Sequence, residues 1–280
     1  MGALLATTLV IVSFNSFKVI EQCLGGVIDA GNLGVIIVDN GSPDGSASAL
    51  SARFPSAEVV ALVQNIGYGR AANKGFERVE TEYALLLNPD IVGDMETIQR
   101  LEQRMGGLSG DVAILAPAVN PRDFRRDGLV ERDWVIGAAL LFRMQSWADV
   151  GGFDENIFLF SEETDLCMRI KEAGKKIFLD SDVYIEHLSK QSSTPSVEVD
   201  FLKDWHYAWS NQYLAVKHGF AHGKCHPRRR LLIYGVKFLT ATNAKKRQKY
   251  KARFMGVRAF LSGEKAFLSD GSPQQSHRLG

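Results

Sequence analysis

The chain has 280 residues, of which 45% are hydrophobic and 23% charged, with 33 Lys and Arg residues against 32 Asp and Glu residues. This composition excludes a disordered, collagenous or fibrous protein and fits one large or two modest folded domains. The three cysteines are far apart and form no CxxC pair. We therefore expect neither a disulfide framework nor a cysteine zinc site, which suits a reducing cytoplasm.

The net charge of +1 conceals a division of charge along the chain. Residues 1–204 carry 18 basic and 30 acidic side chains, whereas residues 205–263 carry 13 basic side chains and no acidic one. Such a carboxylate-free stretch indicates a separate face or subdomain that meets an anionic partner. We expect no targeting or membrane-spanning segment, because the apolar stretch at residues 3–14 lacks a basic leader and is too short.

Predicted strands and helices alternate along the first half of the chain. Continuous apolar runs predict buried strands at residues 9–14, 35–39 and 83–87, with a shorter strand at 58–62. Helical spacing of apolar residues predicts helices at 18–30, 46–53, 70–80 and 95–105. This order predicts an open α/β sheet whose ligands bind at the carboxyl ends of its strands.

The second half is less regular. Strands are predicted at 112–117 and 135–142, a helix at 163–173 and a polar loop at 121–133. From Val199 onward the apolar spacing is helical.

Three polar motifs follow predicted strands. Asp39 can accept a hydrogen bond from a base N–H at the sheet edge, and a helix-capping turn is the alternative. Residues 64–75 (QNIGYGRAANKG) combine glycines with a helix N-terminus that suits an anion; a plain tight turn is the alternative. Asn88-Pro89-Asp90 closes a buried strand, where an aspartate suits a divalent cation that holds a diphosphate.

An acidic cluster follows later in the chain, at Glu162, Glu163 and Asp165. Mutual repulsion raises the pKa of at least one such carboxyl towards that of a useful base. The same residues suit a helix N-terminus, and both interpretations can hold. His187 follows a predicted strand and, taken alone, is most simply structural.

The ordered set of motifs strongly resembles the family-2 inverting glycosyltransferases of the GT-A fold, and most closely their rhamnosyltransferase-like branch. Seven segments within residues 8–193 carry the resemblance: IVSFNS, IIVDNGSPDGS, QNIGYGRAANKG, LLLNPD, WVIGAALLFR, VGGFDENIFLFSEETDLCMR and IEHLSKQSS. It implies a Rossmann-like, mostly parallel sheet flanked by helices. The charge division and the helical spacing after Val199 add a basic helical C-terminal extension.

The resemblance and the division of charge together predict the domains. A catalytic domain would cover residues 1–200, with a nucleotide-sugar half at 1–120 and an acceptor half at 121–200. A basic amphipathic helical region would cover residues 201–263, and residues 264–280 would form a disordered tail.

For the donor, the resemblance implies that Ser13 and Asn15 line the nucleotide pocket and that Asp39 binds the pyrimidine N–H. Gly67 and Asn73 would shape the nucleotide-sugar side of that pocket.

For the metal, the resemblance places Asn88 and Asp90 where the family has its Asp-x-Asp motif. Asp90 would bind Mg²⁺ or Mn²⁺, with His187 as the second protein ligand.

For the acceptor and the base, the resemblance implies two further groups. Trp134, Gly137 and Ala138 would begin the acceptor site. Glu163 stands at the family's usual base position, with Asp165 and Glu162 in reserve.

These roles imply a metal-dependent inverting transferase. The donor would be dTDP-L-rhamnose or a UDP-sugar, and the acceptor a saccharide hydroxyl, linked to polyprenyl pyrophosphate, in surface polysaccharide synthesis. A sugar-nucleotide nucleotidyltransferase is one alternative, although the glycine-rich, Arg/Lys-bearing loop that it would want after the first strand is missing. A non-catalytic membrane- or carbohydrate-binding homologue is another.

The basic region would dock on an anionic membrane, at the cytoplasmic face of the inner membrane. A solvated appendage or a homodimer contact is the alternative. Nucleic-acid binding is not expected, because no recognised module accompanies the charge.

Overall fold

The computed structural model describes residues 5–124, 128–188 and 196–274. Parts of the expected loop (125–127), of the last matched segment (189–193) and of the expected tail (275–280) lie outside these ranges. The chain forms two compact bodies. We call Met1–Phe153 with Glu163–Thr194 the sheet body, and Asp154–Glu162 with Pro195–Gly280 the helical body.

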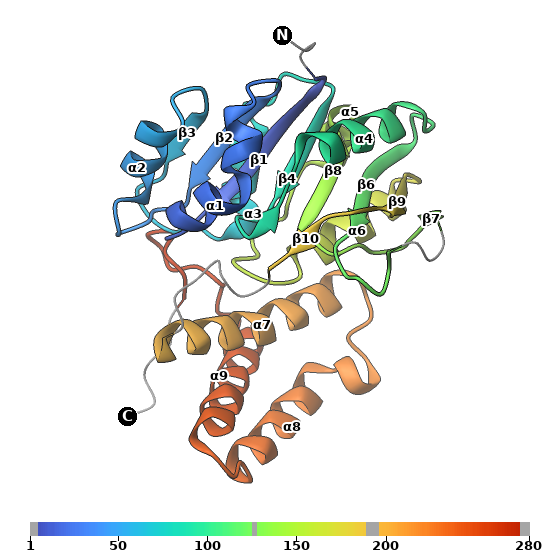
Figure 1. Cartoon of the computed structure of the whole chain (residues 1–280). Coiled ribbons are helices and arrows are strands. Elements are labelled where there is room, and N and C mark those ends of the chain that lie inside the picture. The colour runs from blue at the N-terminus through green and yellow to red at the C-terminus, as the bar shows by residue number, and fades with distance from the viewer. Residues whose placement is uncertain (1–4, 125–127, 189–195, 275–280) are drawn as a thin grey trace. The chain divides into compact units, whose positions relative to one another are not determined.

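An eight-stranded sheet forms the centre of the sheet body (Figure 1). The strand order is β3 (Glu58–Ala61), β2 (Gly34–Asp39), β1 (Thr7–Ser13), β4 (Tyr83–Leu87), β8 (Ala139–Arg143), β6 (Val112–Ala118), β9 (Lys176–Tyr184) and β7 (Leu129–Glu131). Strands β3, β2, β1 and β4 run parallel, as do β6 and β9, whereas β8 runs antiparallel to both β4 and β6. A small antiparallel pair joins β5 (Ile91–Val92) to β10 (Glu186–His187). The expected mostly parallel sheet is confirmed.

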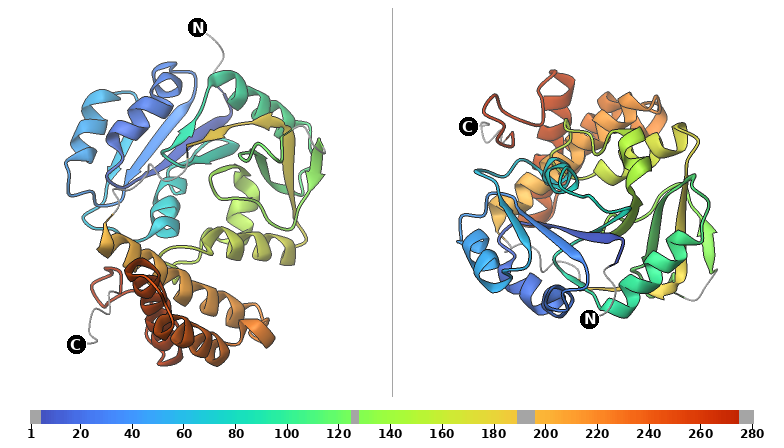
Figure 2. Two further views of the ribbon diagram at one scale, coloured as in Figure 1. Left: turned by 60° about the horizontal axis from the view of Figure 1, so that its bottom comes forward. Right: turned by 90° about the horizontal axis from the view of Figure 1, so that it is seen from above.

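Helices cover both faces of this sheet (Figure 2). One layer contains α1 (Phe17–Asp29), α2 (Ser46–Arg53) and α4 (Met95–Gly106), and the other α3 (Tyr68–Phe76), α5 (Met144–Val150) and α6 (Glu162–Glu172). Alternate residues of a strand face opposite sides, so Leu9 and Ile11 of β1 pack in the first layer and Val10 and Val12 in the second. Both faces are buried, which explains the continuous apolar runs.

The helical body contains α7 (Val197–Lys217), α8 (Pro227–Leu239) and α9 (Ala244–Leu261), with a short 3₁₀ turn at Gly223–Cys225. Trp205 and Trp209 of α7 pack with Met255 of α9 in its core. Gly256 permits this close approach, because a Cβ there would clash with the Trp205 carbonyl oxygen. The expected helical C-terminal extension is confirmed.

Two local expectations differ from the structure. The polar stretch 121–133 contains β7, a three-residue edge strand too short to show an apolar period. Residues 264–274, expected to be disordered, are held by tertiary contacts: Trp209 Nε1 donates a hydrogen bond to the Glu264 carbonyl (2.9 Å), and Ala266 is fully buried.

Within the described ranges, none of the helices has the length and hydropathy needed to cross a bilayer.

The packing of α3 on the sheet depends on Gly75. A Cβ at this position would lie 2.6 Å from Val10 Cγ1 and 3.2 Å from Val38 Cγ2. We expect Gly75→Ala to lower the free energy of unfolding by about 1–3 kcal/mol, because over-packing forces side chains or backbone to shift. Urea unfolding measures this, with Gly26→Ala in α1 as the control.

A Cβ at Gly26 would meet nothing within 4 Å. The control variant should therefore be neutral or gain up to about 1 kcal/mol from helix propensity. Equal unfolding midpoints for the two variants would contradict the proposed close contact.

Candidate active site

The carboxyl ends of β1 and β2 bring Ser13 and Asp39 side by side. The two residues are register partners in the parallel pair, and the N–H of Asn40 donates a hydrogen bond to the Ser13 carbonyl at 2.7 Å. Both side chains are buried. Polar groups buried at this edge of a parallel sheet are positioned to meet a ligand.

The Asp39 carboxylate organises the turn that follows it. It accepts hydrogen bonds from the Ser42 N–H (2.9 Å) and the Ser42 hydroxyl (2.6 Å), and Ser42 Oγ accepts one from the Asn15 N–H (2.8 Å). At the start of the next helix, the Ser46 N–H donates a hydrogen bond to the Asp44 carboxylate at 3.0 Å. Asp39 therefore ties the turns after β1 and β2 together and does not cap α2.

Two polar atoms at this edge lack a hydrogen-bond partner among the described residues. They are Ser13 Oγ and Asn15 Oδ1, and both are buried. Asn15 also has a left-handed backbone, with φ 53°. An unsatisfied buried polar group costs about 1–3 kcal/mol, which a ligand with hydrogen-bonding groups would recover. These two atoms could therefore bind a ligand that carries hydrogen-bonding groups.

Asn40 and Asn65 join the turn after β2 to the loop before α3. Asn40 Nδ2 donates to Asn65 Oδ1 (3.1 Å) and to the Gly67 carbonyl (3.3 Å), and Asn40 Oδ1 accepts from the Ile66 N–H (2.9 Å). Gly67 precedes α3 with φ 90°, a backbone conformation that favours glycine. Both asparagines lie in motifs of the sequence analysis, but only their hydrogen bonds in the structure show that they hold the two loops together.

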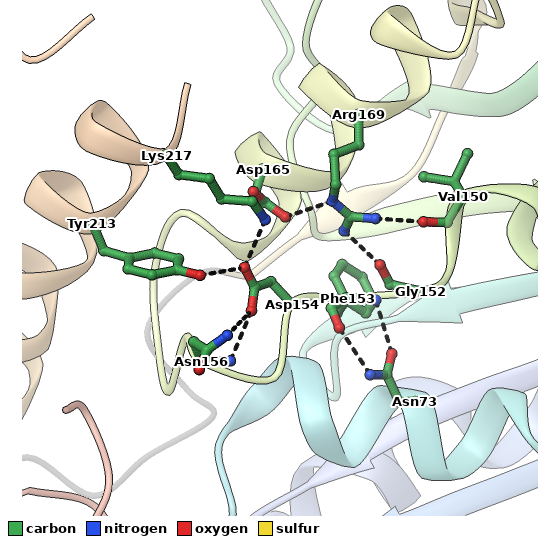
Figure 3. Close-up of polar contacts among 10 residues, drawn as sticks. All are labelled: Asn73, Val150, Gly152, Phe153, Asp154, Asn156, Asp165, Arg169, Tyr213 and Lys217. Atoms are coloured by element: carbon green, nitrogen blue, oxygen red, sulfur yellow. Dashed lines mark hydrogen bonds and ion pairs between the residues drawn. The ribbon is translucent and has the colours of Figure 1, made fainter. Parts of the chain in front are cut away.

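Asn73 holds the segment Gly152–Phe153 against α3. Its Oδ1 accepts from the Phe153 N–H (2.9 Å), and its Nδ2 donates to the Phe153 carbonyl (3.0 Å) (Figure 3). Both polar ends of the amide are thus engaged by one backbone residue. Asn73 therefore acts on the shape of the site through this segment.

Asp90 and His187 lie together although 97 positions separate them. Their side chains approach to 3.2 Å between Asp90 Oδ1 and His187 Nε2, with Asp90 buried and His187 about one-fifth exposed. Pairing of β5 with β10 sets this distance: His187 is the partner of Ile91, and the Leu188 N–H donates to the Asp90 carbonyl at 3.0 Å. The two residues offer a carboxylate oxygen and an imidazole nitrogen.

The segment before β8 links the Asn-Pro-Asp turn to the acidic cluster. The Asn88 N–H donates to the Ala138 carbonyl at 2.9 Å, so Ala138 contributes its backbone. A Cβ on the neighbouring Gly137 would lie 3.3 Å from both Cβ and Cγ of Glu163. In the same segment the indole of Trp134 is nearly half exposed.

Glu163 and Asp165 occupy different environments on α6. Asp165 is fully buried and paired with Arg169 at 2.8 Å, and Arg169 also donates to the carbonyls of Val150 and Gly152 (Figure 3). Glu163 is half-buried, and this burial raises the pKa of its carboxyl above the ordinary value of 4.5. Asp165 is held in an ion pair, whereas the carboxyl of Glu163 takes up a proton more readily than an exposed glutamate does.

The helical body holds the segment 154–162 that leads into α6. Asp154 accepts hydrogen bonds from Lys217 Nζ (2.6 Å), Tyr213 Oη (2.8 Å) and the Asn156 N–H (2.8 Å) (Figure 3). Glu162, the last residue of this segment, is buried.

The sequence model described as Glycosyl transferase family 2 matches residues 8–169, which is more than half of the chain. The chain belongs to this family. The resemblance inferred from the motifs is thereby confirmed.

Two curated relatives are rhamnosyltransferases. The N-acetylglucosaminyl-diphospho-decaprenol L-rhamnosyltransferase of Mycobacterium tuberculosis is 26% identical, over 50% of this chain and 61% of the relative. Rhamnosyltransferase WbbL of Escherichia coli is 29% identical over 30% of this chain and 31% of its own length. The match thus spans less than two thirds of either relative.

Two solved structures share the fold. The mannosyltransferase PcManGT from Pyrobaculum calidifontis, in complex with GDP-Man and Mn²⁺, gives a TM-score of 0.60 at 15% identity, over 92% of this chain and 74% of that chain. S. aureus TarS 1-349 in complex with UDP gives 0.56 at 14% identity, over 97% of both chains. The expected GT-A type of this family member is confirmed.

The Asp154 cluster generates a prediction about the pH dependence of stability. Burial would raise the pKa of Asp154, but the hydrogen bonds from Lys217, Asn156 and Tyr213 lower it to about 2. A lowered pKa means that the stabilisation is present above the ordinary value of 3.8 and is lost as the pH falls through about 2. Asp154→Asn should therefore cost about 1–2 kcal/mol near neutral pH and progressively less below pH 4.

Urea unfolding at neutral and acid pH measures this effect. Asp133→Asn, whose side chain is 93% exposed, serves as the control and should change little. A penalty for Asp154→Asn that is equal at both pH values would contradict the assignment.

Proposed function

We propose that this family member transfers a sugar from a nucleoside-diphosphate donor, dTDP-L-rhamnose or a UDP-sugar, to a hydroxyl of a lipid-linked saccharide. The observation that carries this proposal is the contact pair at Gly137 and Ala138, which links Glu163 to the Asn-Pro-Asp turn. In this proposal the base and the diphosphate site would therefore be neighbours. The names of the two rhamnosyltransferase relatives support the sugar and, in one case, the lipid-linked acceptor.

The donor nucleotide would bind at the ends of β1 and β2. Ser13 Oγ and Asn15 Oδ1, the orphan atoms at this edge, would form hydrogen bonds with it. Asp39, held by two hydrogen bonds from Ser42, has lone pairs left to accept a pyrimidine N–H. Preorganised, buried groups bind a ligand without a further cost of ordering their side chains.

The donor diphosphate would be held by a divalent cation at Asp90 and His187. The described residues contain no convergent set of three or more His, Cys, Asp and Glu groups. In this proposal Asp90 and His187 are the protein ligands, and the diphosphate and water would complete the shell. Carboxylate oxygens suit Mg²⁺ and Mn²⁺, and the imidazole nitrogen favours Mn²⁺. When bound, such a cation neutralises charge that develops on the departing nucleoside diphosphate.

Glu163 would act as the general base. Its carboxylate takes the proton of the acceptor hydroxyl, whose oxygen forms a bond to the anomeric carbon from the face opposite the leaving group. The bond between that carbon and the diphosphate oxygen breaks, and the configuration inverts. A raised pKa strengthens the base, and general-base catalysis contributes about 10²–10⁴ in rate.

Family membership favours sugar transfer over the formation of sugar nucleotides. Incubation with a sugar phosphate and nucleoside triphosphates tests that alternative, since a nucleotidyltransferase would release pyrophosphate. A non-catalytic homologue would hydrolyse no donor at all. Donor hydrolysis with and without EDTA distinguishes it from the proposed transferase.

The first prediction of this proposal concerns the metal site. Asp90→Asn should abolish Mn²⁺-dependent nucleotide binding in calorimetry and turnover of the donor, because it removes the buried anionic ligand. His187→Gln should weaken Mn²⁺ binding in the same assay. The exposed-site control Asp133→Asn should behave as wild type, and full activity of Asp90→Asn or of wild type in excess EDTA would overturn the proposal.

The second prediction concerns the base. Glu163→Gln should lose about two or more orders of magnitude in kcat while donor binding is retained. Wild-type activity should fall as the pH drops through a value above 4.5, and this acid limb should be absent from the residual rate of Glu163→Gln.

Asp165→Asn is the informative comparison, because it breaks the pair with Arg169. We expect it to lower the thermal midpoint, with a smaller effect on kcat of the folded enzyme than Glu163→Gln. If Asp165→Asn is folded but inactive while Glu163→Gln remains active, the base is Asp165.

A further inference from the structure

One face of α8 carries large apolar side chains that do not pack in the core. Leu232, Val236 and Leu239 are 68%, 51% and 77% exposed, and their spacing of four and three residues places them on one stripe. The other side of the helix is satisfied, since Tyr234 packs with Val257 of α9. The stripe is therefore exposed and is not needed for the packing of α8 on the rest of the helical body.

Basic residues flank this stripe at both ends. Arg228 and Arg229 precede Leu232 by four and three residues and are exposed. Beyond Leu239, α9 opens with exposed Lys245 and Lys246, and α8 packs along α9. This arrangement matches a bilayer surface. The apolar stripe would meet the hydrocarbon boundary, and the cations at its two ends would meet the anionic head groups.

The positions of these cations are electrostatically unfavourable within the protein. In both α8 and α9 the first residue is followed by three consecutive basic residues, and neither helix has an acidic residue in its first turn. The N-terminus of a helix carries a partial positive charge and favours anions. Both helices thus carry cations at the end where the helix dipole favours anions, which indicates an external anionic partner.

Charge also favours a membrane over the other possible partners of this stripe. A second copy docked on the same stripe would bring its own basic residues against these ones, and residues 205–263 contain no carboxylate to offset them. The stripe is aliphatic, whereas single-stranded nucleic acid binds on exposed aromatic platforms. An anionic lipid surface satisfies both the charge and the apolar side chains.

We propose that α8, with the first turn of α9, docks on an anionic membrane surface and inserts Leu232, Val236 and Leu239 at the head-group boundary. The purpose of this docking rests on the proposed function, in which the acceptor is attached to a membrane lipid. The docking itself requires no turnover and can be measured alone.

Co-sedimentation of the full chain with vesicles tests the proposal. The protein should pellet with phosphatidylcholine vesicles that contain phosphatidylglycerol, and not with phosphatidylcholine alone. Binding should weaken between about 0.1 M and 1 M salt, as the Debye length falls from about 10 Å to about 3 Å. Failure to bind anionic vesicles at the lower salt would overturn the proposal.

Two variants separate the contributions of the stripe and the charges. Leu232→Gln/Val236→Gln/Leu239→Gln should lose about tenfold or more in vesicle partitioning, as buried apolar groups are removed from the interface. Arg228→Gln/Arg229→Gln/Lys245→Gln/Lys246→Gln should lose about two or more orders of magnitude, since each basic residue contributes about fivefold. Val63→Gln, at a fully exposed position of the sheet body, is the control and should bind as wild type.

Two further readouts keep the docking and the transferase apart. Donor hydrolysis without vesicles should be equal in wild type and in both variants. If hydrolysis is normal and the stripe variant pellets as wild type does, the docking is wrong and the transferase stands. If hydrolysis is absent from wild type while vesicle binding follows the predicted pattern, the docking stands and the transferase is wrong.

Sedimentation of the protein alone tests whether the stripe is a contact between two copies of the chain. If wild type is a dimer and the stripe variant is a monomer, the membrane assignment is overturned.

Discussion

The antiparallel direction of β8 is the constraint on which the candidate active site depends. Because β8 runs against β4, the residues that precede it lie at the carboxyl edge of β4, where Asn88 and Asp90 follow. Ala138 then meets the backbone of Asn88, and Gly137 meets Glu163. A parallel β8 would carry this segment to the opposite edge of the sheet. The acidic cluster and the Asn-Pro-Asp turn would then have no common neighbour.

Much of the sheet body could be predicted from the sequence because its strands are buried on both faces. Runs such as residues 9–14 and 83–87 are apolar without alternation, and the helices between them show a clear period. The direction and neighbours of β8 could not be predicted, because an apolar run looks the same in either direction. The short strand β7 has too few residues for a period to appear.

The candidate site was predictable to a different extent for each residue. The order of the motifs indicated Asp90 and His187 as candidate metal ligands. The distance between their side chains, however, depends on the pairing of β5 with β10, two strands of two residues each. Asn73 was expected beside the donor, yet its amide binds the backbone of Phe153, 80 residues away. Long-range pairing of this kind leaves no local periodicity in a sequence. The motifs therefore identify the residues, and the tertiary contacts determine what each can do.

The segregation of charge has a physical cost that bears on what the helical body does. The cations with the clearest structural roles find carboxylates outside the basic stretch: Arg253 pairs with Asp204 at 2.8 Å, and Lys217 with Asp154 at 2.6 Å. The remaining excess, including Lys245 and Lys246, lies on the surface, where like charges repel one another and oppose the helix dipole. A few of these cations make contacts within the helical body, since Lys237 lies 5.4 Å from the ring centroid of Tyr250 and Arg247 lies 5.5 Å from that of Phe238. The anionic surface proposed as the partner of α8 would convert the remaining repulsion into attraction.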